Sequence, residues 1–122
     1  MKINSTGETM PTVKVPRNIQ LIAQRALNYN LDQPPSRRAA YKDEGGKRVP
    51  GTGMKTARKL ASGEVDLEQL KVMSAWFARH GESPKEAKAR KDKTSKAAVA
   101  WALWGGTPGR AWVNRTIKKL ED

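Results

Sequence analysis

The 122-residue sequence contains no cysteine and only one histidine. The lack of cysteine excludes disulfides and thiolate zinc sites, and a single histidine cannot form a histidine-rich metal site. His80 ends an apolar helical pattern, where the side chain of a histidine can bond the last carbonyls of the helix. No nucleophile or carboxylate pair is placed as in an active site. We therefore expect neither an enzyme nor a protein that holds a metal or cofactor.

Long apolar stretches are also missing. The most apolar run, residues 97–106, is about half the length that a bilayer crossing needs. The N-terminal residues 1–16 contain no apolar core of signal-peptide length. These features predict a soluble intracellular protein without a membrane partner.

Acidic residues are scarce relative to basic ones. Asp and Glu total 12 against 24 Lys and Arg, which gives a formal net charge of +12. Such a chain repels itself, and a polyanion relieves the repulsion. Nucleic acid is the expected partner because neutralising its phosphates releases counterions. We favour DNA over RNA, and sequence-tolerant binding. The alternative is an interaction protein that binds a host protein or an acidic virion surface. The sequence does not indicate an oligomeric state.

Apolar residues recur at helical spacing, and no period-two stretch is long enough for a sheet. We therefore expect an all-α fold of about five short helices packed as a small bundle, spanning residues 15–122. Residues 1–14 are expected to form a flexible, disordered arm. Helix boundaries follow from Pro16, from an Asp66 cap with Gln69 completing a capping box, and from caps at Ser95 and Thr107. The expected helices cover 16–30, 52–62, 67–81, 96–104 and 108–122.

Two basic segments, residues 33–53 and 82–96, contain little that could pack into a core. The first is expected to be a loop rich in Pro and Gly, and the second either a solvated loop or a frayed helix. Flexible basic segments bind nucleic-acid backbones without reading base sequence. With cations from residues 52–62 and the glycine turn, they supply the expected contacts. These nucleic-acid-binding residues are Arg37, Arg38, Lys42, Lys47, Arg48, Lys55, Arg58, Lys59, Lys85, Lys88, Arg90, Lys91, Lys93, Lys96 and Arg110.

The helices expected at 52–62 and 67–81 resemble a helix-turn-helix, with a glycine in the turn. In that module the second helix enters the major groove with its first residues at the bases. Here the second helix starts with Asp66 and Glu68, which would repel phosphate. The cations Lys55, Arg58 and Lys59 lie on the first helix instead. An ordinary helical hairpin is therefore favoured over a base-reading module.

Three tryptophans, Trp101, Trp104 and Trp112, lie within twelve positions of one another. Indoles stack on unpaired bases in some proteins, but a cluster at a helix corner is more often core. We favour the core. The glycines between these tryptophans leave amides near a helix start beside Arg110, which suits an anion. The Lys-Ser/Thr end of a P-loop is missing, so nucleotide hydrolysis is not expected.

Residues 53–113 resemble a small tailed-phage domain of uncertain role with a W-x-L-W-G-G-x-x-G-R-x-W signature. Trp76 departs from the family pattern, which has Phe, and Thr107-Pro108 replaces an acidic pair. The resemblance implies a bacteriophage protein acting in the host cytoplasm, and it implies no particular activity. The matching residues are Ala57, Arg58, Leu60, Ala61 and Gly63; Met73, Phe77 and His80; and Trp101, Leu103, Trp104, Gly105, Gly106, Gly109, Arg110 and Trp112.

Overall fold

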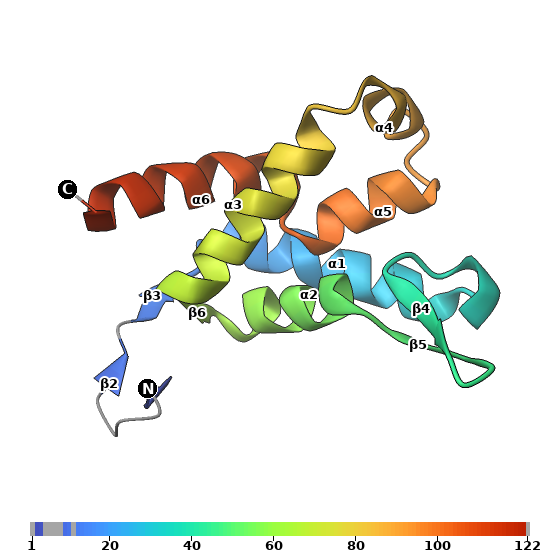
Figure 1. Ribbon diagram of the computed structural model, residues 1–122, viewed down its shortest axis with the longest axis horizontal. Helices are drawn as coiled ribbons and strands as arrows, with labels where there is room; N and C mark the ends of the chain where they lie inside the picture. Colours follow the sequence, from blue (N-terminus) through green and yellow to red (C-terminus); the bar gives the residue numbers. More distant parts are fainter. Residues whose placement is uncertain (1, 4–8, 11, 122) are drawn as a thin grey trace.

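The computed structural model describes residues 2–3, 9–10 and 12–121 (Figure 1). The fold is mostly helical, with short antiparallel strand pairs. The helices are α1 (Arg17–Asp32), α2 (Thr52–Ser62), α3 (Leu67–Gly81), α4 (Pro84–Ala89), α5 (Lys96–Leu103) and α6 (Gly106–Glu121), with a 3-10 turn η1 (Pro35–Arg37) after α1. The strands are β1 (Lys2–Ile3), β2 (Thr9–Met10), β3 (Thr12–Lys14), β4 (Tyr41–Glu44), β5 (Lys47–Pro50) and β6 (Glu64–Asp66).

The strand pairs correct the expectation of a purely all-α bundle. β1 pairs with β2, β3 with β6, and β4 with β5. β3 lies in the segment expected to be a flexible arm, where Val13 pairs with Val65. The Val15 amide continues this pairing by donating to the Gly63 carbonyl at 2.8 Å. The sequence pattern missed β3 and β6 because each has three residues and its partner lies far along the chain. Residues 1, 4–8 and 11 of the expected arm lie outside the described residues.

A hairpin replaces much of the expected loop at 33–53. Tyr41 at the start of β4 pairs with Pro50 at the end of β5. The connecting Gly45 and Gly46 have φ of +58° and +80°, the left-handed backbone that a two-residue hairpin turn requires. Charged side chains cover both strands, so the apolar alternation that marks a strand was absent. In the second basic segment, the structure forms α4, whose first turn is capped by the Ser83 hydroxyl.

The helix boundaries largely follow the capping signals. α2 spans the predicted residues and ends at Gly63, whose φ is +99°. Asp66 caps α3 by accepting from the Gln69 amide, and Ser95 caps α5 by accepting from the Ala98 amide. The Thr107 cap was wrong, because α6 already begins at Gly106. The Thr107 hydroxyl instead accepts a hydrogen bond from the Trp101 indole at 3.1 Å.

A single core joins the helices. α1 packs against α2, α5 and α6, and α3 packs against α6. Ile19 of α1, Leu60 of α2, Phe77 of α3 and Leu103 of α5 are all buried there. In Figure 1, the β4–β5 hairpin and α4 lie at the same end of the molecule as the start of α5. The two basic segments are thus held at one end by the helical core.

Candidate nucleic-acid interface

The two basic segments meet next to α1. The Lys96 ammonium at the start of α5 donates to the carbonyl of Ser36 in η1 at 3.2 Å. Buried Asn30 of α1 holds the η1 segment in place, because its side chain exchanges two 2.9 Å hydrogen bonds with the backbone of Ala39. Segments 60 residues apart in the sequence are therefore fixed side by side.

Two adjoining hollows run between α1 and α5. The first has a volume of about 340 Å³ and the second about 480 Å³. They share Tyr29 and Val99, so together they form one surface feature, which we name the α1–α5 groove. It is lined by Ile22, Arg25, Ala26, Tyr29, Asn30, Gln33, Arg37, Lys93, Thr94, Lys96, Ala98, Val99 and Ala102.

The groove carries positive charge without neutralising partners. Its cations are Arg25, Arg37, Lys93 and Lys96, and no Asp or Glu lines it. In the described part of the chain, none of these four side chains forms an ion pair. Tyr29 is 39% exposed there and presents an aromatic ring to solvent. The groove therefore offers an anionic ligand both charge and a stacking surface.

A tight turn before α5 positions the groove lysines. The Asp92 carboxylate accepts from the Thr94 hydroxyl at 2.7 Å and from the Thr94 amide at 2.9 Å. These bonds, the hydroxyl first, lower the pKa of Asp92 below its usual range. The Ser95 hydroxyl then donates to the carbonyl of Ala89 in α4 at 2.8 Å. Lys93 and Lys96 thus extend from a chain segment with a fixed backbone.

The cations of α2 lie elsewhere. Arg58 lines a separate hollow with Gln24, Leu27 and Leu31 of α1. These α1 positions differ by about half a helical turn from residues 22, 26 and 29 in the groove. Lys55 and Lys59 are exposed beside Arg58, and the Lys59 ammonium donates to Gln69 at 3.1 Å. The structure therefore divides the predicted cations between two faces of α1.

Several predicted contacts in the hairpin have partners within the protein. Arg38 donates to the carbonyls of Gln33 and Leu31, at 2.8 and 2.9 Å, where α1 ends. It also lies over the Tyr41 ring at 5.2 Å. Two ion pairs lie within the hairpin, Lys42 with Glu44 at 3.5 Å and Arg48 with Asp43 at 3.4 Å. Lys47 is exposed at the hairpin end.

The remaining predicted cations fall into two groups around α4. Lys85, Lys88 and Lys91 are exposed. Arg90 instead lies 4.0 Å from the centre of the Trp101 ring, and Arg110 pairs with Glu82 at 3.1 Å. These two arginines tie α4 and α6 to the aromatic cluster and the end of α3.

The aromatic cluster is largely core, as predicted. Trp104 and Trp112 are 3% and 7% exposed. The helix-turn-helix resemblance weakens, because the connection from α2 to α3 forms β6 and pairs with β3. Asp66 and Gln69 at the start of α3 are also buried, so these side chains do not face an incoming base. The favoured interpretation of an ordinary helical hairpin agrees better with this geometry.

Sequence reasoning missed Arg25 and Tyr29. Both lie on α1, one helical turn apart, outside the two basic segments. A weak signal did exist, because aromatic residues and arginine are both enriched at binding surfaces. The sequence does not show that α5 packs beside α1. It therefore gave no reason to group Arg25 and Tyr29 with Lys93 and Lys96.

Within the described ranges, no cluster of three or more His, Cys, Asp or Glu side chains is placed to hold a metal ion. Nor does any helix in these ranges have the length and hydropathy of a membrane span. Comparison with protein families, curated proteins and solved structures finds no match to this chain. The likeness of residues 53–113 to a tailed-phage domain therefore stays a prediction.

Proposed function

We propose that this protein binds nucleic acid by placing backbone phosphates along the α1–α5 groove. The observation that carries the proposal is the set of four groove cations, which have no ion-pair partner and no acidic neighbour in the groove lining among the described residues. Neutralising phosphates there releases counterions and relieves the self-repulsion of a chain with a net charge of +12.

The groove favours binding that tolerates any base sequence. Lys93 and Lys96 carry compact ammonium charges, which attract a phosphate without requiring the fixed planar geometry of an arginine. The ring of Tyr29 can stack on any base, because every base has a π face. We further propose a bacteriophage origin, on the resemblance described above. With it we propose DNA rather than RNA as the polymer and the host cytoplasm as the site of action.

The test is a binding titration of labelled DNA across a range of salt concentrations. With phosphate contacts at the four groove cations, the log–log slope should be about −3 to −4. Replacing all four, as R25Q/R37Q/K93Q/K96Q, should weaken binding at least about tenfold and flatten the slope by about 3. The matched control K42Q/K47Q/K85Q/K88Q removes the same charge from the hairpin and α4.

Equal weakening by both variants would mean that net charge, and not the groove, holds the DNA. Absence of binding to any nucleic acid at low salt would exclude the proposal altogether. In that case a pull-down from nuclease-treated host lysate becomes the informative experiment. A single retained host protein would favour the alternative role as an interaction protein.

A further inference from the structure

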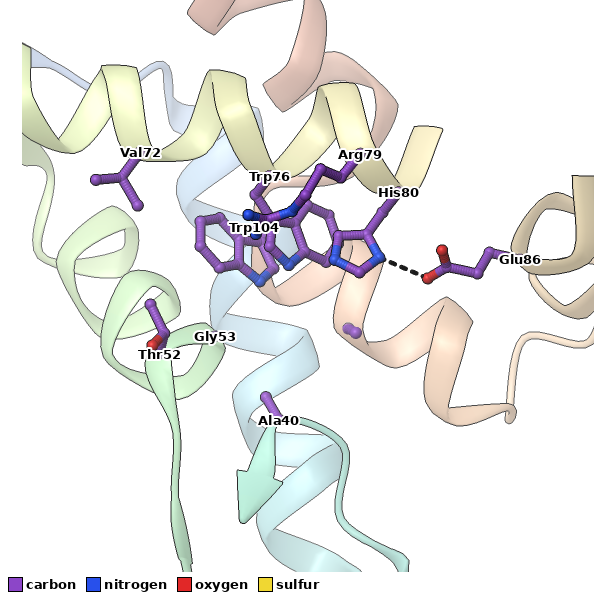
Figure 2. A pocket seen from close by; sticks show the side chains of 10 residues that line it. Ala40, Thr52, Gly53, Val72, Trp76, Arg79, His80, Glu86 and Trp104 are labelled. Carbon is purple, nitrogen blue, oxygen red and sulfur yellow. Dashed lines mark hydrogen bonds and ion pairs between the residues drawn. The ribbon is translucent and has the colours of Figure 1, made fainter. Parts of the chain in front are cut away.

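A separate cavity of about 390 Å³ lies between the start of α2, the last turns of α3, and α5 (Figure 2). It shares no lining residue with the α1–α5 groove. Thr52 and Gly53 line it from α2, Trp76 and Arg79 from α3, and Trp104 follows the end of α5.

The start of α2 lines the cavity with Thr52 and Gly53, and its first amides have no partner in the described part of the chain. The helix has 11 residues, and the Gly51 position that precedes it supplies no capping side chain. No hydrogen bond of the described residues uses the amides of Thr52, Gly53 or Met54. These groups carry the positive end of the helix dipole, which favours an anion.

The indole N–H of Trp104 is a second, independent donor. Trp104 is only 3% exposed, yet its Nε1 donates to no acceptor in the described part of the chain. No buried side-chain nitrogen or oxygen there is sealed off without a partner, so this N–H must open into the cavity that Trp104 lines. A Cβ on Gly53 would lie 3.1 Å from Nε1, so the glycine lets the indole approach the helix start.

The faces of the neighbouring aromatic rings stack on one another, so that a ligand in the cavity would contact their edges. Trp76 stacks on Trp104 with centroids 4.6 Å apart and an interplanar angle of 9°, and His80 lies 4.5 Å from Trp76. Figure 2 shows the nitrogens of both indoles on the ring edges that face Gly53 and Ala40. The edge of an aromatic ring carries partial positive charge, so it too favours an acceptor-rich ligand.

Two charged groups complete the lining. Arg79 is exposed above the rings and makes no ion pair in the described part of the chain. The one lining acid, Glu86, bonds Nδ1 of His80 at 2.7 Å, on the side of His80 away from the two indoles (Figure 2). The lining therefore combines donors at the end near Gly53 with a cation on the α3 side of the rings.

We propose that this cavity is a binding site for a phosphate group, as inorganic phosphate or as a phosphate monoester. The amides of Thr52 and Gly53, the Trp104 indole and Arg79 would each donate to its oxygens. The site does not depend on the proposed function, because its residues are distinct from those of the groove.

The test follows NMR signals of the full chain during titration with inorganic phosphate, against chloride at equal ionic strength. Saturable shifts are expected at the Trp104 indole N–H and the Gly53 amide. W104F keeps the ring but removes the donor, and should weaken binding about tenfold. W112F, at a similarly buried tryptophan outside the cavity, should leave binding unchanged. R79Q changes an exposed side chain and should weaken binding in a folded protein even if W104F does not fold.

Absence of shifts at Trp104 and Gly53, or shifts spread over all basic residues without saturation, would overturn the proposal. Two further titrations distinguish a phosphate monoester from free phosphate as the ligand. Tighter binding of adenosine 5′-monophosphate than of inorganic phosphate would point to a monoester, and equal binding to the free ion. The quadruple groove variant should bind phosphate as the parent does, so that failure of the groove and failure of this site remain distinguishable.

Discussion

The α1–α5 groove and the β4–β5 hairpin carry comparable numbers of cations but offer them differently. In the hairpin, Lys42 and Arg48 pair with acidic neighbours, and among the described residues only Lys47 is exposed there without an ion pair. Arg38, just before the hairpin, bonds backbone carbonyls. In the groove, Arg25, Arg37, Lys93 and Lys96 have no ion-pair partner among the described residues. The density of basic residues along a sequence therefore does not measure the charge available to a ligand. That charge depends on which side chains are already neutralised.

The largest loss of stability is expected from a substitution at Asn30, which lines the α1–α5 groove. N30A removes the side chain that exchanges two hydrogen bonds with Ala39, and leaves buried backbone groups without partners. The free energy of unfolding should fall by about 2–3 kcal/mol, measured by urea denaturation. Q24A, on the exposed side of the same helix, should change it by less than about 0.5 kcal/mol. Equal stabilities would show that Asn30 does not hold the segment after η1 against α1.

The second effect compares the two tyrosines. Y29A removes the exposed ring of the groove and should weaken binding to single-stranded DNA about tenfold, which corresponds to about 1.4 kcal/mol. Y41A removes the ring beside Arg38 in the hairpin and should leave DNA binding almost unchanged. Fluorescence anisotropy with one labelled strand measures both. A larger loss for Y41A would move the binding surface to the hairpin.

Single lysine substitutions can also distinguish the groove from the hairpin. K93Q should reduce the magnitude of the salt slope by about 1, because one phosphate contact is lost. K42Q should leave the slope unchanged, since Lys42 already pairs with Glu44. Titrations at several salt concentrations give both slopes. Identical slopes for the two variants would mean that ion pairing in the hairpin does not withhold its charge.

The smallest effect concerns the hairpin pairs themselves. E44Q removes the partner of Lys42, and both side chains are largely exposed. The free energy of unfolding should therefore change by less than about 1 kcal/mol. The freed lysine should add a little affinity for DNA at low salt. Thermal denaturation and anisotropy measure the two effects, and a large loss of stability would show that the pair is more than a surface contact.

Much of the helical fold followed from local signals. The bounds of α2, the Gly63 cap, and the Asp66 and Ser95 caps depend on residues within one turn, so the sequence alone identifies them. The capping box predicted at Asp66 was confirmed for one of its two hydrogen bonds. The Gln69 amide bonds Asp66 as expected, while the Gln69 side chain bonds Thr56 and Lys59 of α2. Tertiary packing thus gave that side chain partners that spacing could not predict.

Some residues of the candidate site were also predictable from the sequence, and others were not. Lys93 and Lys96 were predicted because they lie in a basic segment, and Arg37 for the same reason. Arg25 and Tyr29 were missed, because nothing near them in sequence indicates that α5 will pack alongside α1. The cavity at Gly53 was equally hidden, since its donors come from three separate helices or their ends.

The excess of positive charge, the helical segments and their caps follow from the sequence, because they depend on composition and on neighbours within a few residues. Which of the described cations have an acidic partner depends on the tertiary structure. Ion pairing, the meeting of η1 with α5, and the approach of Trp104 to the start of α2 all depend on distances between residues far apart in the chain. The pairing of β3 with β6 was decided in the same way, since each strand is too short to form without its partner.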